Sequence, residues 1–101
     1  GYASLGANTT ANDNTAVGSK ALQLNTTGTR GVAVGFESLK ANTTGYGNIA
    51  VGYASLTANT TGANNVAVGI LALDANTTAD NNTAVGFHAE VLTQQVLVIQ
   101  Q

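Results

Sequence analysis

The chain has no cysteine, proline, methionine or tryptophan, and it carries few charges. Without cysteine there is no disulfide framework, so cysteine usage gives no indication of the redox compartment. Only 8% of the residues are charged, against roughly 25% in an ordinary globular domain. The net charge is −2 and the three basic residues are scattered, which argues against nucleic acid and anionic membrane surfaces as partners. No apolar run approaches the roughly 20 residues that cross a bilayer, so we expect no membrane insertion.

Sequence motifs that carry chemistry are missing as well. There is no P-loop, no Gly-x-Ser-x-Gly nucleophile motif, no Gly-x-Gly-x-x-Gly dinucleotide motif and no Gly-Gly-x-Gly-x-Asp calcium signature. His88 is the only histidine, and no cysteine or second histidine accompanies it as a metal ligand. The carboxylates recur at no single spacing and so form no row of paired acids: Asp13, Glu37, Asp74, Asp80 and Glu90. We therefore predict no catalytic residues, no metal site and no cofactor, and a protein that is not an enzyme.

A 17-residue repeat runs through almost the whole chain and decides the fold class. The tripeptide Ala-Val-Gly recurs without insertion or deletion, and its glycines, together with one in phase at the start, are Gly1, Gly18, Gly35, Gly52, Gly69 and Gly86. A leucine recurs at Leu5, Leu22, Leu39, Leu56 and Leu73. Asn-Thr-Thr begins at Asn8, Asn25, Asn42, Asn59 and Asn76. This phasing argues against a disordered linker, and it divides the chain into a repeat array over residues 1–88 and a different segment over residues 89–101.

Each repeat has the length and pattern of one coil of a β-solenoid. Its Val-Ala-Val or Ile-Ala-Val core, as at residues 49–51, alternates large β-branched and small side chains with the period of a strand. Asn-Thr-Thr followed by Gly or Ala is turn chemistry. Seventeen residues are too few for the two helices of a helical repeat. We predict an all-β fold of stacked coils, each with a strand, a corner, a short second strand and another corner.

Stacked coils turn each repeat position into a row of equivalent residues along the solenoid axis, because neighbouring coils lie about 4.8 Å apart. We expect the repeated valines and leucines to form the apolar interior and the alanines to leave a thin outer face. We expect the Asn-Thr-Thr asparagines to form a structural ladder, with each amide donating to one neighbour and accepting from the other. A 17-residue coil has a small core, so identical thin faces would gain stability by covering one another in a closed cyclic oligomer.

Four phrases of the repeat carry a family resemblance. "NTAVG", "VAVGFESL" and "IAVGYASL", joined by "NTTG", resemble the head repeats of trimeric autotransporter adhesins and of related phage and bacterial tail-fibre-like surface proteins. The resemblance covers residues 1–88. It implies a homotrimer of left-handed parallel β-rolls about one axis, an extracellular place on a bacterial cell surface or a virion tail fibre, and host-surface proteins or glycans as partners.

Three functions are compatible with such an array. The first is a structural and adhesive segment of a trimeric fibre, and the second is a pure spacer or filament-forming subunit without a ligand. The third is ice binding, because regular threonine rows can match an ice lattice, although adjacent threonines in a strand point to opposite faces.

Asn-Thr-Thr is also an N-glycosylation sequon, but a stacked corner explains its spacing better. The aromatic residues Tyr2, Phe36, Tyr53 and Phe87 share one repeat position, which favours a row of packing residues over a ligand-stacking strip.

The segment "AEVLTQQVLVIQQ" leaves the repeat abruptly. Ala89, Leu92, Val96 and Ile99 are spaced three, four and three residues apart, as in the seam of a coiled coil. We therefore predict the start of a stalk in which these residues contact their symmetry mates. The alternative is that residues 96–99 form a final strand that caps the open edge of the roll. Because the chain opens in phase with the repeat and without an initiator methionine, we expect it to be a segment of a longer protein.

Overall fold

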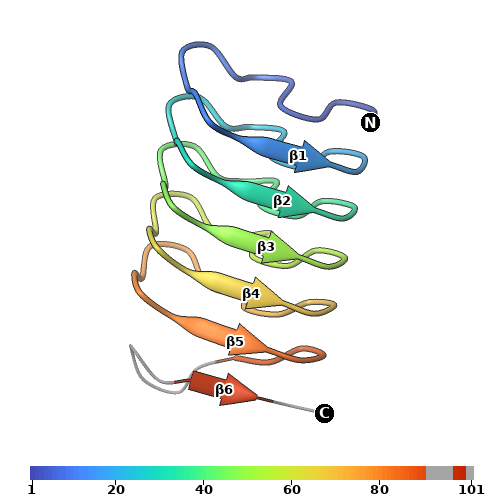
Figure 1. Ribbon diagram of the computed structural model, residues 1–101, viewed down its shortest axis with the longest axis vertical. Coiled ribbons are helices and arrows are strands. Elements are labelled where there is room, and N and C mark those ends of the chain that lie inside the picture. The colour runs from blue at the N-terminus through green and yellow to red at the C-terminus, as the bar shows by residue number, and fades with distance from the viewer. Residues whose placement is uncertain (91–96, 100–101) are drawn as a thin grey trace.

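The computed structural model describes residues 1–90 and 97–99, and these form a parallel β-solenoid. Every strand pairs in parallel with the next, in the order of the chain (Figure 1). The strands are β1 (Thr15–Val17), β2 (Val32–Val34), β3 (Ile49–Val51), β4 (Val66–Val68), β5 (Thr83–Val85) and β6 (Leu97–Ile99). The register of the first five strands is the sequence repeat itself, since Thr15 pairs with Val32 and Ile49 with Val66. The described residues contain no helix, and so no apolar helix that could cross a membrane. The predicted all-β solenoid of 17-residue coils is confirmed.

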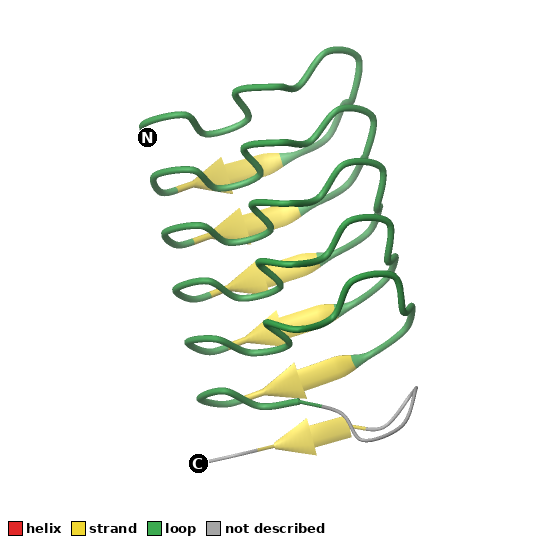
Figure 2. Ribbon diagram, turned by 180° about the vertical axis from the view of Figure 1, so that it is seen from behind, coloured by secondary structure: helices red, strands yellow, loops and turns green. Residues whose placement is uncertain are grey.

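The side of each coil across from the strand is a run of tight turns, not the predicted short second strand (Figure 2). In the coil that begins at Gly52, Ala54 and Leu56 adopt left-handed φ angles of 55° and 49°. The amide of Ala54 donates to Phe36 in the coil before, Ser55 donates within its own coil, and Leu56 donates to Ala72 in the coil after. The alternating φ sign thus points successive peptide groups up, within and down the stack, which satisfies the backbone without a second sheet.

The core contains the alanines of the strands and the leucines of the turns. Ala33, Ala50 and Ala67 are fully buried, as are Leu39 and Leu56 across the coil. The leucine side chains fill the narrow interior, which leaves room for only a methyl group on the facing strand. Because side chains alternate across a strand, the flanking valines then point outward. The prediction that valine lies inside and alanine outside is therefore wrong, whereas the predicted leucine row does lie inside.

The described part of the C-terminal segment is a strand and not a helix. Leu97 pairs with Thr83 and Ile99 with Val85, so β6 continues the ladder below β5 (Figure 1). The predicted coiled coil is therefore wrong at residues 97–99, where the chain gains more by pairing with the open edge of β5. Ala89 lies in the core of its own chain and its carbonyl accepts from the amide of Leu73. Leu92 and Val96, the other two predicted stalk contacts, lie outside the described residues.

Candidate functional site

The structure brings the five Asn-Thr-Thr asparagines into one hydrogen-bonded row. Asn59 Nδ2 donates to Asn42 Oδ1 at 2.9 Å, and Asn76 Nδ2 donates to Asn59 Oδ1 at 2.9 Å. Each Nδ2 also donates to a carbonyl three residues on, as from Asn59 to Gly62 at 3.0 Å. Asn25, Asn42 and Asn59 are buried, so their amides are committed to this row and are not accessible for glycosylation.

The repeat glycines mark the end of each strand, where the backbone of the next coil lies close by. Five repeat glycines have φ angles between 122° and 135°, which non-glycine residues rarely adopt: Gly18, Gly35, Gly52, Gly69 and Gly86. A Cβ atom at Gly1 would lie 3.1 Å from the carbonyl carbon of Gly18, and one at Gly35 would lie 2.7 Å from the carbonyl oxygen of Gly52. Glycine is therefore needed for its conformation and for its size.

A second asparagine row, which we did not predict from the sequence, lies just before the strands. Its members are Asn14, Asn48, Asn65 and Asn82. The Oδ1 atom of Asn48 accepts from the backbone amide of Asn65 at 3.0 Å, and its Nδ2 atom donates to the carbonyl of Gly62 at 2.8 Å. The sequence contains a pattern that indicates this second row, because an asparagine precedes four of the five Ala-Val-Gly strands. Gly31 occupies this position in the remaining coil.

We expect Gly31→Asn to raise the free energy of unfolding by about 1–2 kcal/mol, because it completes the second row. Gly31 already donates from its amide to Asn14 Oδ1 at 2.8 Å, and its φ angle is not in the left-handed region. A Cβ atom there would meet Asn14 Oδ1 at 3.2 Å, so that side chain must shift by a few tenths of an ångström. The measurement is chemical denaturation. Gly31→Ala is the matched control, because it restricts the unfolded chain without adding hydrogen bonds. Equal stabilities of the two variants would contradict this account.

The outward side of the sheet is an apolar surface, which we call the outer face. It consists of the first and third residues of strands β1 to β5, which are Thr15, Val17, Val32, Val34, Ile49, Val51, Val66, Val68, Thr83 and Val85. Val17 is 56% exposed and Ile49 is 38% exposed. All ten side chains are β-branched and none is charged. A contiguous surface of this kind marks an interaction site more often than a solvated face.

The aromatic repeat position forms an exposed row, which is more open than the packing row that we predicted. Tyr2, Tyr53 and Phe87 are 76%, 51% and 65% exposed. The rings of Phe36 and Tyr53 are stacked, with centroids 5.6 Å apart and planes 11° from parallel. Because this position directly follows the strand-ending glycine, the row borders one end of the outer face.

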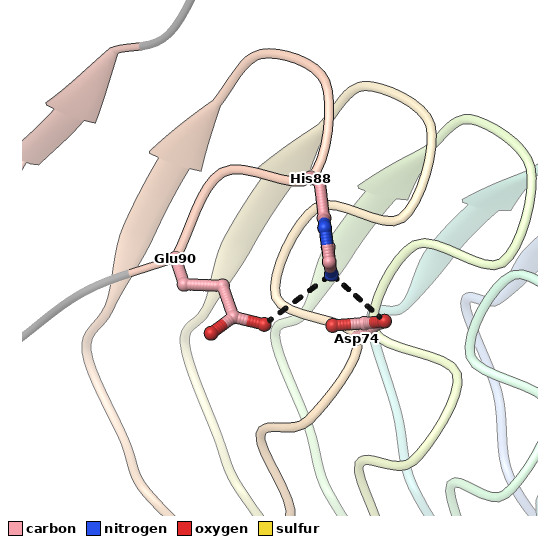
Figure 3. A group of neighbouring side chains, drawn as sticks. All are labelled: Asp74, His88 and Glu90. Atoms are coloured by element: carbon pink, nitrogen blue, oxygen red, sulfur yellow. Dashed lines mark ion pairs between the residues drawn. The ribbon is translucent and has the colours of Figure 1, made fainter.

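A cluster of three chemically active side chains lies at the C-terminal end of the array (Figure 3). His88 Nε2 lies 3.4 Å from Asp74 Oδ2 and 3.8 Å from Glu90 Oε1. A hydrogen bond with Asp74 is the main cause that raises the pKa of the Glu90 carboxyl, and desolvation and the charge of Asp74 raise it further, while His88 lowers it. Asp74 is 14 residues from His88 in the sequence, and only the stacking of the coils brings the two side chains together.

The chain matches no family model, no curated protein and no solved structure. The resemblance to adhesin head repeats therefore stays a prediction that rests on the repeated phrases alone.

Proposed function

We propose that this chain is a structural and adhesive segment of a trimeric surface fibre, in which three parallel copies cover one another's outer faces. The observation that carries the proposal is the outer face itself: ten β-branched side chains in two straight rows, on a sheet whose other side is already the core. Burial of apolar surface stabilises association by about 25 cal/mol per Å² before the costs of binding. The left-handed coil, the threefold symmetry and the place outside the cell are contributed by the family resemblance.

The thinness of the coil also supports association. Its apolar interior holds one alanine of the strand and one leucine of the turn run per layer, as with Ala50 and Leu56, and in some layers a second alanine such as Ala72. A repeat array with so little core gains stability from stacking and from covering its open faces. The outer face is the broad apolar surface that an oligomer would bury, and cyclic symmetry brings identical faces together without leaving one uncovered.

Adhesion, as distinct from a pure spacer role, is favoured by the exposed aromatic row. Aromatic rings supply large contact areas with few rotatable bonds, and the stacked pair Phe36 and Tyr53 presents both rings to solvent at 41% and 51% exposure. Host-surface proteins and glycans are the partners that the resemblance implies. Binding of the oligomer to collagen, to host cells or to surface glycans separates the adhesive function from the spacer.

Ice binding gains less support from the structure. The second threonines of the triplets form an exposed row at Thr10, Thr27, Thr44, Thr61 and Thr78. The first threonines contribute differently, because the Thr26 and Thr43 hydroxyls donate to carbonyls of the next coil at 3.2 and 3.3 Å. The triplets thus offer one fully exposed row where a lattice match needs a two-dimensional array. Thermal hysteresis tests this function.

We expect light scattering on the 101-residue chain to give three times its monomer mass of 10.1 kDa. Val51→Lys should raise the concentration for half-dissociation by more than about a hundredfold, because it places an unpaired charge from each copy in the buried interface. Val51 is the central member of its row on the outer face.

Thr61→Lys is the matched control, since it adds the same charge to an exposed position away from the strand. Val51→Thr should have a smaller effect than Val51→Lys, because Thr15 and Thr83 already stand on the outer face. Circular dichroism establishes that each variant is folded. A wild-type chain that is monomeric at high micromolar concentration would overturn the proposal, and so would equal effects of Val51→Lys and Thr61→Lys.

A further inference from the structure

We propose that Asp74, His88 and Glu90 bind a divalent transition-metal ion, with Zn²⁺ as the best fit, and that the ion joins the last two coils of the array. Asp74 belongs to the turn run of one coil, and His88 and Glu90 belong to the next (Figure 3). An ion held by all three would cross-link the stack near its C-terminal end. The proposal does not depend on the oligomer described above.

The geometry of the three ligand atoms fits tetrahedral coordination. One atom from each side chain lies within 4.8 Å of the other two. In a tetrahedron with metal–ligand bonds of about 2.0–2.1 Å, neighbouring ligand atoms are about 3.3 Å apart. The distances from His88 Nε2 to Asp74 Oδ2 and Glu90 Oε1 are 3.4 and 3.8 Å. His88 and Glu90 are about half exposed, so small rotations of their side chains would complete the site.

The repeat supplies an internal comparison that sets this cluster apart. One coil earlier, the three equivalent positions hold Thr57, Leu71 and Leu73, which offer no comparable set of ligands. Glu90 stands where earlier coils place the leucine of the core row, and Asp74 stands at a variable position of the unit. One departure from the repeat, at Glu90, and two side chains at variable positions thus converge on one point in space.

Electrostatics favour a cation at this point. The carboxyl groups of Asp74 and Glu90 lie close together, and a hydrogen bond with Asp74, burial and the negative charge of Asp74 all raise the pKa of Glu90. A divalent ion held between the two carboxylates would offset the repulsion between their negative charges. A shallow cavity lined by Leu73, Ala75, Asn76 and Glu90 opens beside the cluster and gives access from solvent.

The donor set selects the class of metal. One imidazole nitrogen and two carboxylate oxygens suit Zn²⁺ and similar first-row ions, whereas Ca²⁺ takes six to eight oxygen ligands. Three protein ligands leave a fourth position for water or for a group from another molecule.

The test is titration calorimetry of the untagged 101-residue chain with Zn²⁺ and, separately, with Ca²⁺. We expect one Zn²⁺ per chain, weak or no Ca²⁺ binding, and a melting temperature that rises by a few degrees with Zn²⁺ and returns after EDTA. Co²⁺ should give the visible absorption of a tetrahedral site. His88→Gln and Asp74→Asn should each weaken Zn²⁺ binding by more than about tenfold.

Glu37→Gln is the matched control, because Glu37 forms another surface ion pair in the array, with Lys40 at 3.4 Å. It should leave Zn²⁺ binding unchanged. Because His88 is exposed, its substitution should not unfold the chain, and light scattering should show the same oligomeric state as the wild type. The proposal is overturned if Zn²⁺ does not bind at millimolar concentration, if His88→Gln binds it as tightly as the wild type, or if Ca²⁺ binds equally well.

Discussion

Gly52→Ala should lower the free energy of unfolding by about 3 kcal/mol or more, which is enough to unfold a thin solenoid under ordinary conditions. Gly52 has a φ angle of 134°, outside the left-handed region that alanine can enter. A Cβ atom there would also lie 2.5 Å from the carbonyl oxygen of Gly69 and 2.6 Å from its carbonyl carbon. Those are backbone atoms of the next coil, which its own hydrogen bonds hold in place, as with Gly69 donating to Val51 at 2.8 Å. The strain and the clash therefore add.

Gly47→Asn is the control that separates this effect from the loss of any glycine. Gly47 also has a positive φ, but its value of 66° is one that asparagine adopts. Asn64 and Asn81 occupy the same repeat position with φ angles of 59° and 62°. The new Cβ atom would meet the exposed amide of Asn64, which can rotate away. We expect a change within about 0.5 kcal/mol, measured by urea unfolding. Comparable losses for the two variants would contradict the close contact at Gly52.

The sequence predicts the architecture well because the repeat fixes the register. A strict 17-residue period requires that equivalent residues stack, so Ile49 must pair with Val66 and the Asn-Thr-Thr asparagines must form a row. Tertiary structure in a solenoid is therefore mostly a matter of local pattern and period, and both are visible in the chain.

The direction of the strand side chains was not predictable from the pattern. Alternation shows that alanine and valine lie on opposite faces, but it does not show which face is inside. The general preference for burying valine pointed the wrong way. Which face of the strand lies inside depends on Leu39 and Leu56. Their left-handed φ angles direct the leucine side chains into the coil, and these side chains fill it. Left-handed leucines are unfavourable in isolation, so local propensity gives no sign of them.

The cluster of Asp74, His88 and Glu90 was missed for a related reason. Two of its members are 14 residues apart in sequence, and the stacking of coils brings them within 3.4 Å. The known period stacks residue 71 on residue 88 and residue 73 on residue 90, so it could have suggested that Asp74 lies near both His88 and Glu90. It could not have given the direction of His88, whose φ angle of 52° is another left-handed exception.

Asn59→Ala should lower the free energy of unfolding by about 3 kcal/mol, because it breaks the asparagine row at a fully buried member that has a row neighbour on each side. The substitution removes the donor to Asn42 Oδ1 and Gly62 O and the acceptor for Asn76 Nδ2. Each buried polar group left without a partner costs about 1–3 kcal/mol. Some of this cost falls away because Asn76 keeps its bond to Ala79 at 3.1 Å, and a water molecule could enter the space left behind.

Thr57→Ala provides the comparison within the same coil. Thr57 stands at the variable position, where other coils have Gly6, Gln23, Lys40 and Asp74, so the removal of its side chain should change the free energy of unfolding by less than about 0.5 kcal/mol.

Asn59→Asp tests the mechanism further, because the carboxylate keeps the shape and the acceptors but cannot donate, and its charge would be buried. We expect it to be at least as destabilising as alanine near neutral pH and to recover partly in acid, where a protonated carboxyl can donate one hydrogen bond. If Asn59→Ala and Thr57→Ala melt alike, the row of Asn-Thr-Thr asparagines does not stabilise the stack, and the coils must be held together by the backbone ladder, the second asparagine row and the alanine–leucine core.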